Sequence, residues 1–206
     1  IHKRMMAYKE EGYVFDVLRM YVYADPQFRE FEGINVIDGY REELAGVLAS
    51  GQVDTVCVHF LDREMWEILK PFLGKIRLIV WSHGADIQPW WRRKFIYKTD
   101  SMLEEAKKSC EDKMRLWNEV FHTAKTQGHI QMIFVSQYAR EIVEEDYNQD
   151  LKDFSVVISN LIDTNQFKYC EKNAEMRKHI ISIRPYNSAI YGNDLTVNTI
   201  LLLSKK

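Results

Sequence analysis

The sequence predicts an α/β protein with an open, mostly parallel sheet and helices on both faces. Short apolar runs suited to buried strands alternate with longer segments that have the periodicity of amphipathic helices. Between Thr55 and Trp81 a strand, a helix and a second strand follow one another with short turns, and such a βαβ unit requires parallel strands. Because these strand segments are almost continuously apolar, we expect both faces of the sheet to be covered.

The composition is that of a soluble globular protein, with 206 residues, 46% apolar and 28% charged. A net charge of -2 gives no general attraction to nucleic acid, so we expect no such partner. The cysteines (Cys57, Cys110 and Cys170) form no Cys-x-x-Cys pair, which favours reduced thiols over a disulfide framework or a zinc site. No apolar run approaches the ~20 residues of a membrane span, and no secretory signal is recognisable. We therefore expect a cytoplasmic protein.

The N-terminal part is predicted to form a helix, two strands and a second helix. Residues 1–11 have apolar positions at helical spacing, and Gly12 ends that helix. A first helix in an open α/β sheet normally follows a strand, so we expect the first strand to lie before Ile1. Asp38 is placed to cap the second helix and Gly51 to stop it. The two strands and the second helix are expected at Tyr13–Met20, Phe28–Val36 and Tyr40–Ser50.

The remaining elements continue the alternation. Asp62 is placed to cap the helix of the βαβ unit, Ser101 and Glu104 form a capping box for a long helix, and Gly128 follows its end. The apolar stripe of that long helix predicts core packing rather than a cofactor site. We expect strands at Thr55–Phe60, Ile76–Trp81, Ile130–Val135, Phe154–Ile158 and His179–Ile183, a loop at Pro89–Lys98, and helices at Ser101–Gln127, Ala139–Asp146 and Asp194–Ser204.

Polar residues follow almost every predicted strand. Ligands of open parallel sheets bind beyond the carboxyl ends of the strands, so several polar residues along one rim indicate a cleft. These residues are His59, His83, Ser136, Asn160 and Arg184.

His83 is the strongest single candidate. Gly84 follows it and allows a ligand to approach the backbone closely, and Asp86 comes two residues later. The alternative is a histidine that only hydrogen-bonds within its own loop. For His59 such a structural role is favoured, because its neighbours provide no second signal. Neither histidine belongs to a carboxylate–histidine set with zinc spacing, so no metal site is expected.

The segment Pro89–Lys98 mixes aromatic and basic residues, with Trp90, Trp91, Arg92 and Arg93 at its centre. This combination suits an anionic membrane surface, where each basic residue contributes roughly 1 kcal/mol, or stacking on the sugar rings of an acceptor. Stacking on nucleic-acid bases is a minor alternative, given the overall acidity. The alternative is an ordinary loop that packs its tryptophans inward.

Four segments of the sequence together resemble the retaining GT-B-fold glycosyltransferases of family four (group one). In that family a His-Gly-x-Asp turn lines the cleft, Asn-x-Ile-Asp…Phe closes a Rossmann-like N-terminal domain, and a strand ending in arginine opens the donor-binding domain. The matching segments are His83–Asp86, Ser136–Arg140, Asn160–Phe167 and Arg184–Asp194. The resemblance implies an acceptor-side domain over residues 1–160, a linker over 161–178 and the beginning of a nucleotide-sugar-binding domain over 179–206.

The resemblance also implies an activity. The enzyme would move a sugar from a nucleotide-diphosphate sugar to the hydroxyl of a glycan or lipid-linked acceptor with retention, without metal or cofactor. The setting would be bacterial surface-polysaccharide or glycan synthesis, in the cytoplasm or at the inner face of the membrane. His83 would contact the transferred sugar as the catalytic residue, and Arg184, Gly84 and Asn160 would bind the donor. Acceptor or membrane contacts would come from Asp86, Trp90, Trp91, Arg92, Arg93, His59 and Ser136.

The chain departs from the family in two respects. The family lysine before the Gly-x-Asp turn has no counterpart, because Ala189, Ile190 and Tyr191 precede Gly192. Either another cation contacts the phosphate or donor binding is weaker. The second donor motif of the family is absent from its expected place, so we expect residues 1–206 alone to be inactive.

Two other functions compete with the transferase. A non-catalytic module with the same scaffold would use the Trp/Arg segment to hold a glycan, a lipid head group or a protein. A nicotinamide-dependent oxidoreductase is disfavoured, because no Gly-x-Gly-x-x-Gly follows any predicted strand.

Overall fold

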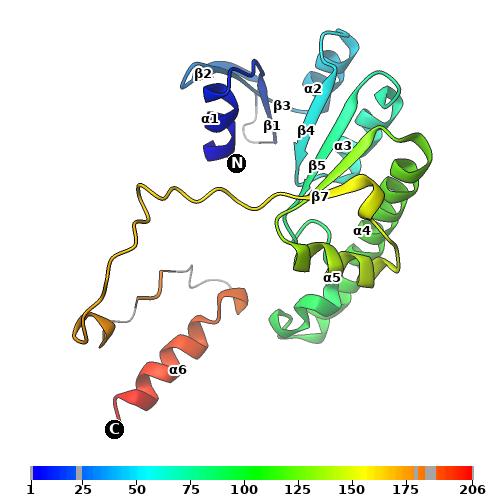
Figure 1. Cartoon of the computed structure of the whole chain (residues 1–206). Helices are drawn as coiled ribbons and strands as arrows, with labels where there is room; N and C mark the ends of the chain where they lie inside the picture. The colour runs from blue at the N-terminus through cyan, green and yellow to red at the C-terminus, as the bar shows by residue number, and fades with distance from the viewer. Residues whose placement is uncertain (1, 22–24, 179–180, 184–188, 206) are drawn as a thin grey trace. The chain divides into compact units, whose positions relative to one another are not determined.

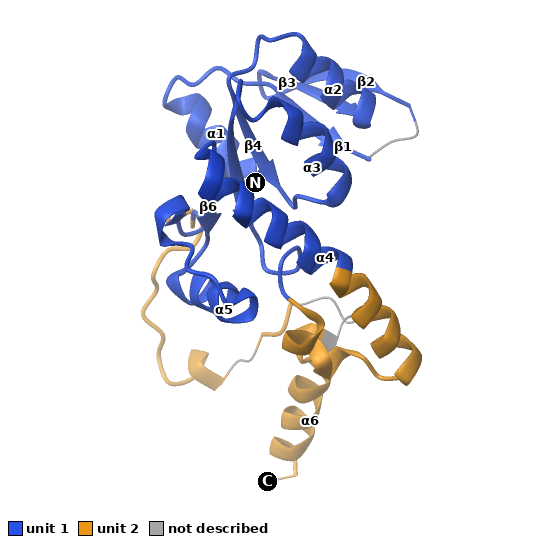
Figure 2. Ribbon diagram, turned by 90° about the vertical axis from the view of Figure 1, so that its right-hand side faces the viewer, with its two compact units in different colours: residues 1–88, 112–161 blue, residues 89–111, 162–206 orange. Residues whose placement is uncertain are grey.

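The structure, a computed structural model, describes residues 2–21, 25–178, 181–183 and 189–205 (Figure 1). The chain divides into two compact units (Figure 2). The first contains residues 1–88 and 112–161, and the second contains residues 89–111 and 162–206. The two units are described separately.

A four-stranded, all-parallel sheet forms the centre of the first unit (Figure 1). The strands lie in the order β4-β5-β6-β7, which is also their order in the sequence. The expected parallel βαβ unit is confirmed, since β4 pairs in parallel with β5. The bounds are β4 Thr55–His59, β5 Arg77–Ser82, β6 Ile130–Phe134 and β7 Ser155–Val157.

Three helices connect these strands, and their apolar side chains form the core with one face of the sheet. The helices are α3 (Arg63–Leu69), α4 (Asp100–Gln127) and α5 (Gln137–Tyr147), with short 3-10 turns at η1 (Lys70–Phe72) and η3 (Lys152–Phe154). Trp66 of α3 and Trp117 of α4 are fully buried in the same cluster as Val80 of β5. The expected cap of α3 is confirmed, because the Asp62 carboxylate accepts from the backbone N–H of Met65 at 2.8 Å. The apolar stripe of α4 is therefore core, as its spacing predicts.

The opposite face of the sheet carries a second set of side chains. His59, Trp81 and Ile133 lie on it at neighbouring positions of β4, β5 and β6. Arg4 of α1 (His2–Glu10) places its guanidinium 5.1 Å from the centre of the Trp81 ring. This contact brings the first helix to the face of the sheet that carries His59.

A smaller mixed sheet precedes the parallel one, in the order β1-β3-β2. Its strands are β1 (Val17–Met20), β2 (Gln27–Phe31) and β3 (Ile34–Gly39). The single strand expected at Phe28–Val36 is therefore wrong, because the chain turns back at Glu32 and Gly33 to form a hairpin. Both turn residues have positive φ, 51° and 69°, as a two-residue hairpin turn of type I′ requires.

The cap predicted for Asp38 is also wrong. Asp38 belongs to β3, is 1% exposed, and accepts hydrogen bonds from Nε of Arg19 at 2.5 Å and Nε of Arg29 at 3.1 Å. Helix α2 (Arg41–Ala49) begins after Tyr40, whose backbone N–H donates to the Glu43 carboxylate at 2.7 Å. The Asp38 side chain points inward because it follows Ile34 and Val36 at the two-residue period of a strand face.

In the second unit, the segment expected as a loop forms the 3-10 helix η2 (Trp90–Ile96). Helix α4 begins at Asp100, one residue before the predicted start, and the Thr99 hydroxyl accepts from the N–H of Met102 at 3.2 Å. The capping box predicted for Ser101 and Glu104 is thus wrong, because Thr99 provides the cap.

The C-terminal helix α6 (Asn193–Leu203) confirms the helix expected from Asp194 onward. It follows the short turns η4 (Met176–Lys178) and η5 (Ala189–Tyr191). The strand expected at His179–Ile183 is not found in residues 181–183, and its first two residues lie outside the described ones. Within the described residues, no helix is long and apolar enough to cross a bilayer.

Candidate functional site

Two histidines meet at the carboxyl ends of adjacent parallel strands. His59 is the last residue of β4, and His83 directly follows β5. The Nδ1 atom of His59 lies 2.8 Å from the Nε2 atom of His83, within hydrogen-bonding distance. Both side chains are half-buried. Two residues that are 24 positions apart in the sequence thus form one polar feature at the rim of the sheet.

Aromatic rings enclose the pair. The His59 ring stacks on Trp81 with centroids 5.1 Å apart, and the Phe60 ring stacks on His83 with centroids 4.3 Å apart. Phe60 has a left-handed backbone with a φ of 60° and leaves 50% of its surface exposed. An L-residue with a bulky side chain is strained there, and such strain is concentrated at functional sites. The conformation of Phe60 therefore supports a functional role for this rim.

The loop after His83 is held firmly. The Asp86 carboxylate accepts from the backbone N–H of His83 at 3.0 and 3.2 Å, and the carbonyl of Asp86 accepts from Nε1 of buried Trp117 at 2.8 Å. Gly84 has a φ of 89°, a left-handed conformation that favours glycine. The turn anchors the backbone of His83, and a Cβ at Gly84 would lie 3.7 Å from the side chain of Gln88.

The surroundings of the two imidazoles keep them neutral. Burial lowers the pKa of His59 from 6.5 to about 4, with further lowering by His83 and by Arg4. Burial also lowers the pKa of His83, and the nearby carboxylate of Asp86 opposes that shift. The pKa of Asp86 itself is raised by burial, against the hydrogen bond from His83. Each ring therefore offers one N–H donor and one lone-pair acceptor at pH 7.

The structure brings some of the predicted site residues together and assigns others a structural role. His59, His83, Gly84 and Asp86 form one cluster at the ends of β4 and β5. Ser136 is the N-cap of α5, where its hydroxyl accepts from the N–H of Ala139 at 3.1 Å. Asn160 comes three residues after the end of β7 and is exposed.

Arg184, the predicted diphosphate ligand, lies outside the described residues.

Four of the predicted acceptor or membrane residues, Trp90 to Arg93, belong to the second unit. In η2 the rings of Trp90 and Trp91 meet edge to face at 6.0 Å, and the Lys107 ammonium lies 5.5 Å from the Trp90 ring. Trp91 is 41% exposed, and Arg93 breaks the helical backbone. Trp91 thus does not pack fully inward, and the contact predicted for Trp90 to Arg93 stays a prediction.

Phe60, Trp81 and Arg4 are site neighbours that sequence reasoning missed. Trp81 could have been identified from the sequence, because the parallel register of the two strands sets it opposite His59. Phe60 directly follows His59 at a strand end, but nothing in the sequence predicts its left-handed backbone. The approach of Arg4 depends on the placement of α1, which no local pattern specifies.

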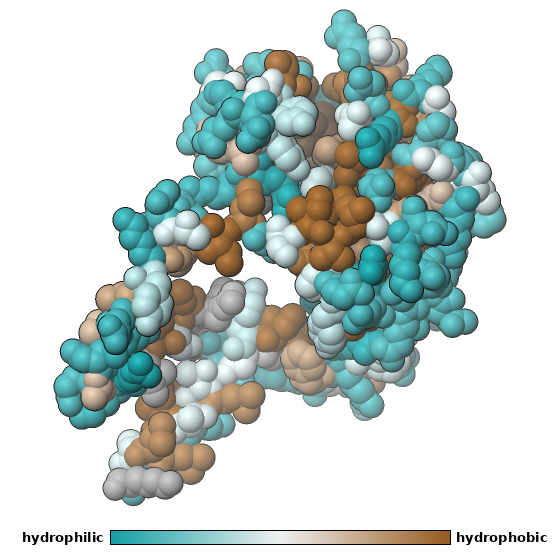
Figure 3. Space-filling view, viewed as in Figure 1, coloured by the Kyte–Doolittle hydropathy of each residue, from teal (hydrophilic) through white to brown (hydrophobic). Residues whose placement is uncertain are grey.

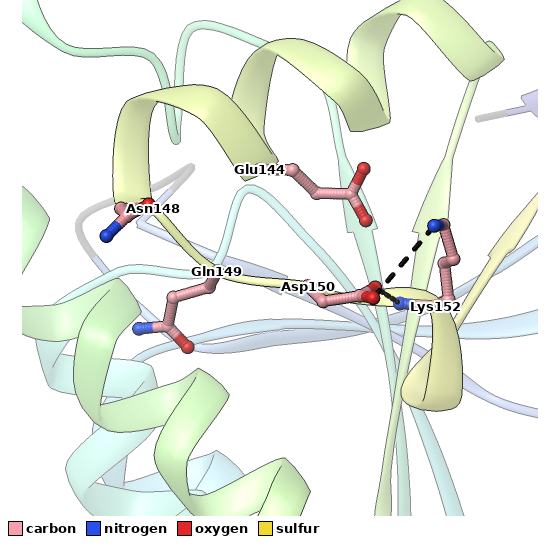
Figure 4. A pocket seen from close by; sticks show the side chains of 5 residues that line it. All are labelled: Glu144, Asn148, Gln149, Asp150 and Lys152. Carbon is pink, nitrogen blue, oxygen red and sulfur yellow. Dashed lines mark hydrogen bonds and ion pairs between the residues drawn. The ribbon is translucent and has the colours of Figure 1, made fainter.

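The two best-defined surface depressions lie elsewhere, near the amino ends of β6 and β7. One, of about 280 Å³, is lined by Glu144, Asn148, Gln149, Asp150 and Lys152 (Figure 4). Asp150 accepts from the backbone N–H of Lys152 at 3.0 Å, and Glu144 accepts from the N–H of Leu151 at 3.0 Å. The other, of about 450 Å³, is lined in part by Gly128, Gln131 and Asp153. These polar side chains bond to their own loop or, as Gln149 does with Lys125 and Asn118, to α4, so the depressions suggest no chemistry.

The face of the first unit seen in Figure 3 is mainly hydrophilic, with a hydrophobic patch over β7. Val156, Val157 and Ile158 are exposed there. Among the described residues, no group of three or more His, Cys, Asp or Glu side chains is placed to hold a metal ion. A comparison of the chain with protein-family models, with curated proteins and with solved structures finds no match.

Proposed function

We propose that this chain is the acceptor-side part of a retaining glycosyltransferase and that His83 contacts the transferred sugar. The observation that carries the proposal is the His59–His83 pair at the carboxyl ends of two adjacent parallel strands, 2.8 Å apart and followed by a left-handed Gly84. Ligands of open parallel sheets bind at this rim. The turn after β5 also agrees with the His-Gly-x-Asp motif that the sequence shares with the family.

The neutral state of His83 suits a sugar substrate. A hydroxyl group both donates and accepts hydrogen bonds, and a neutral imidazole complements it without the desolvation cost of a charge. The turn closed by Asp86 fixes the backbone of His83. His83 therefore orients the sugar rather than acting as a nucleophile.

In the proposed reaction, the acceptor oxygen bonds to the anomeric carbon as the bond from that carbon to the diphosphate oxygen breaks. Attack occurs on the face that the leaving group departs from, so the configuration is retained. The acceptor proton passes to the released diphosphate. Arg184 is proposed to stabilise the diphosphate charge through its planar donors.

The sheet topology supports the Rossmann-like part of the proposal. Strands β1 and β4 are both edge strands of their sheets. One further parallel strand paired with both would join the sheets into an open sheet in the order β2-β3-β1, new strand, β4-β5-β6-β7. We propose that the expected first strand occupies this position.

A non-catalytic α/β module that binds a glycan, a lipid head group or a protein is the second candidate. The observation that favours it is the exposure of Trp91 at 41% and Phe95 at 66% in a helix that also carries Arg92, Arg93 and Lys94. Exposed aromatic rings beside cations suit sugar rings and anionic head groups.

Hydrolysis and transfer with a panel of nucleotide-diphosphate sugars test the two candidates. The full-length protein is compared with residues 1–206 alone and with two variants, His83→Ala and His122→Ala. His122 is an exposed histidine of α4 and serves as the matched control. We expect turnover by the full-length protein, its loss in His83→Ala only, and no turnover by residues 1–206. No turnover with any donor, together with binding of glycans or anionic vesicles through Trp91, would establish the binding module instead.

A further inference from the structure

The short distance between the two histidine rings limits the possible positions of their protons. A neutral imidazole has one N–H and one acceptor nitrogen. At 2.8 Å, one of the facing atoms, Nδ1 of His59 or Nε2 of His83, donates and the other accepts. If His59 donates, the proton of His83 is on Nδ1, and if His83 donates, its Nδ1 is an acceptor. In either case the hydrogen bond links the tautomers of the two rings.

The support for this arrangement comes from the His59 side of the pair. His59 belongs to β4, is hydrogen-bonded to β5 through the strand ladder, and stacks on Trp81, which is 4% exposed. His83 lies in the turn after β5, with the Phe60 ring on it. The ring of His59 is thus fixed by the sheet, and the ring of His83 is fixed against it.

One nitrogen of His83 remains for a ligand. Its Nε2 is engaged by His59, and across the described part of the chain no hydrogen bond to its Nδ1 is present. Arg4 of α1 and Asp86 of the turn are the charged side chains beside the pair. Neither is hydrogen-bonded to the ring, since Asp86 accepts from the backbone N–H of His83. A sugar hydroxyl at this rim therefore meets Nδ1.

We propose that His59 is a positioning residue, which holds the ring of His83 by its Nε2 and directs Nδ1 toward the substrate hydroxyl. The choice of a sugar as substrate rests on the proposed function above, whereas the coupling of the two rings does not. His59 then acts on the reaction only through His83.

Nuclear magnetic resonance of the 206-residue chain labelled with ¹⁵N-histidine tests the coupling directly. At pH 7 we expect a scalar coupling across the hydrogen bond between Nδ1 of His59 and Nε2 of His83, with both rings in the same tautomer, Nδ1–H or Nε2–H. Absence of the coupling, or different tautomers in the two rings, would overturn the proposal.

Two substitutions at His59 separate the hydrogen bond from the packing. His59→Phe keeps an aromatic ring on Trp81 and removes the nitrogen, so the Nε2 signal of His83 should move away from its hydrogen-bonded position. His59→Asn carries an amide near the position of Nδ1 and should restore that signal. The control His122→Phe removes an exposed histidine signal and should leave His83 unchanged. An Nε2 signal of His83 that is the same in wild type and His59→Phe would also overturn the proposal.

Kinetics in the full-length protein distinguish failure of the inference from failure of the proposed function. With a nucleotide sugar that is turned over, His59→Phe should lower kcat/KM about tenfold and His59→Asn should recover most of it. Coupled rings with equal kcat/KM in all three proteins would refute the positioning role. Coupled rings without turnover of any nucleotide sugar would refute the proposed function and leave the coupling established.

Discussion

Two clusters in the first unit contain polar side chains that are at least partly buried, and these side chains find their polar partners in different ways. In the small sheet, the charge of Asp38 is enclosed by Nε donors of Arg19 and Arg29 at 2.5 and 3.1 Å. At the rim of the parallel sheet, His59 and His83 stay neutral and bond to one another. In the ionic cluster the Asp38 carboxylate accepts from Nε of both arginines, whereas the histidine pair leaves Nδ1 of His83 for a ligand. The contrast identifies the first as structural and the second as the candidate site.

The largest expected effect is on the ionic cluster. Asp38→Ala leaves two partly buried guanidinium groups without their carboxylate, so we expect a loss of about 3–5 kcal/mol in the free energy of unfolding. The matched control is Asp112→Ala, which removes an exposed ion pair with Arg115 at 2.8 Å and should cost less than about 1 kcal/mol. Urea unfolding of both variants measures the difference, and equal losses would show that Asp38 is not structural.

The second effect is on activity rather than stability. His83→Ala should lower nucleotide-sugar turnover about a hundredfold, because a positioned hydrogen bond at the reacting sugar is lost. Its free energy of unfolding should change much less than that of Asp38→Ala, since His83 is only half-buried. If His83→Ala lost as much free energy of unfolding as Asp38→Ala, the role of His83 would be structural, like that of Asp38.

The third effect separates the two regions by pH. Burial lowers the pKa of His59 from 6.5 to about 4. Between these two pH values the unfolded chain therefore binds a proton at His59 that the folded protein does not bind. Its contribution is fully present above pH 6.5 and is lost as the pH falls toward 4, by about 2 kcal/mol at most given the partial exposure of the ring. Hydrogen bonds from Arg19 lower the pKa of Asp38 below 3.8, so its contribution is lost only below that pH.

Urea unfolding at a series of pH values separates the loss of stability due to His59 from the loss due to Asp38. His59→Phe should flatten the stability curve between pH 6.5 and 4 and leave the loss at lower pH in place. A curve of unchanged slope in that variant would contradict the burial of a neutral His59.

The smallest effect concerns a rim residue with a structural role. Ser136→Ala removes the N-cap of α5 and should cost about 1 kcal/mol without changing the tautomer of His83. The exposed rim serine Ser159 provides the control, and Ser159→Ala should be neutral in urea unfolding. A change in the His83 signals of Ser136→Ala would mean that the cap also shapes the site.

The sequence predicts the parallel part of the fold well, because its signals are local. Apolar strand runs, the Asp62 cap and the stripe of α4 each specify an element without long-range information. The adjacency of His59 and His83 also follows from the βαβ unit, since both residues end neighbouring parallel strands.

The errors have a common physical origin. Asp38 stands two residues before Tyr40, the predicted helix start, where a cap is common, but tertiary pairing with Arg19 and Arg29 decides its role. The hairpin depends on positive φ at Glu32, a residue that rarely marks such a turn. The stacking of Phe60 on His83 likewise depends on a backbone conformation that composition does not indicate.

Titration of the full-length, ¹⁵N-histidine-labelled protein with a nucleotide-diphosphate sugar tests the central claim most directly. The account predicts a saturable shift of the Nδ1 signal of His83, with the signal of exposed His122 unchanged. Saturable binding of the donor that leaves the Nδ1 signal of His83 in place would contradict it.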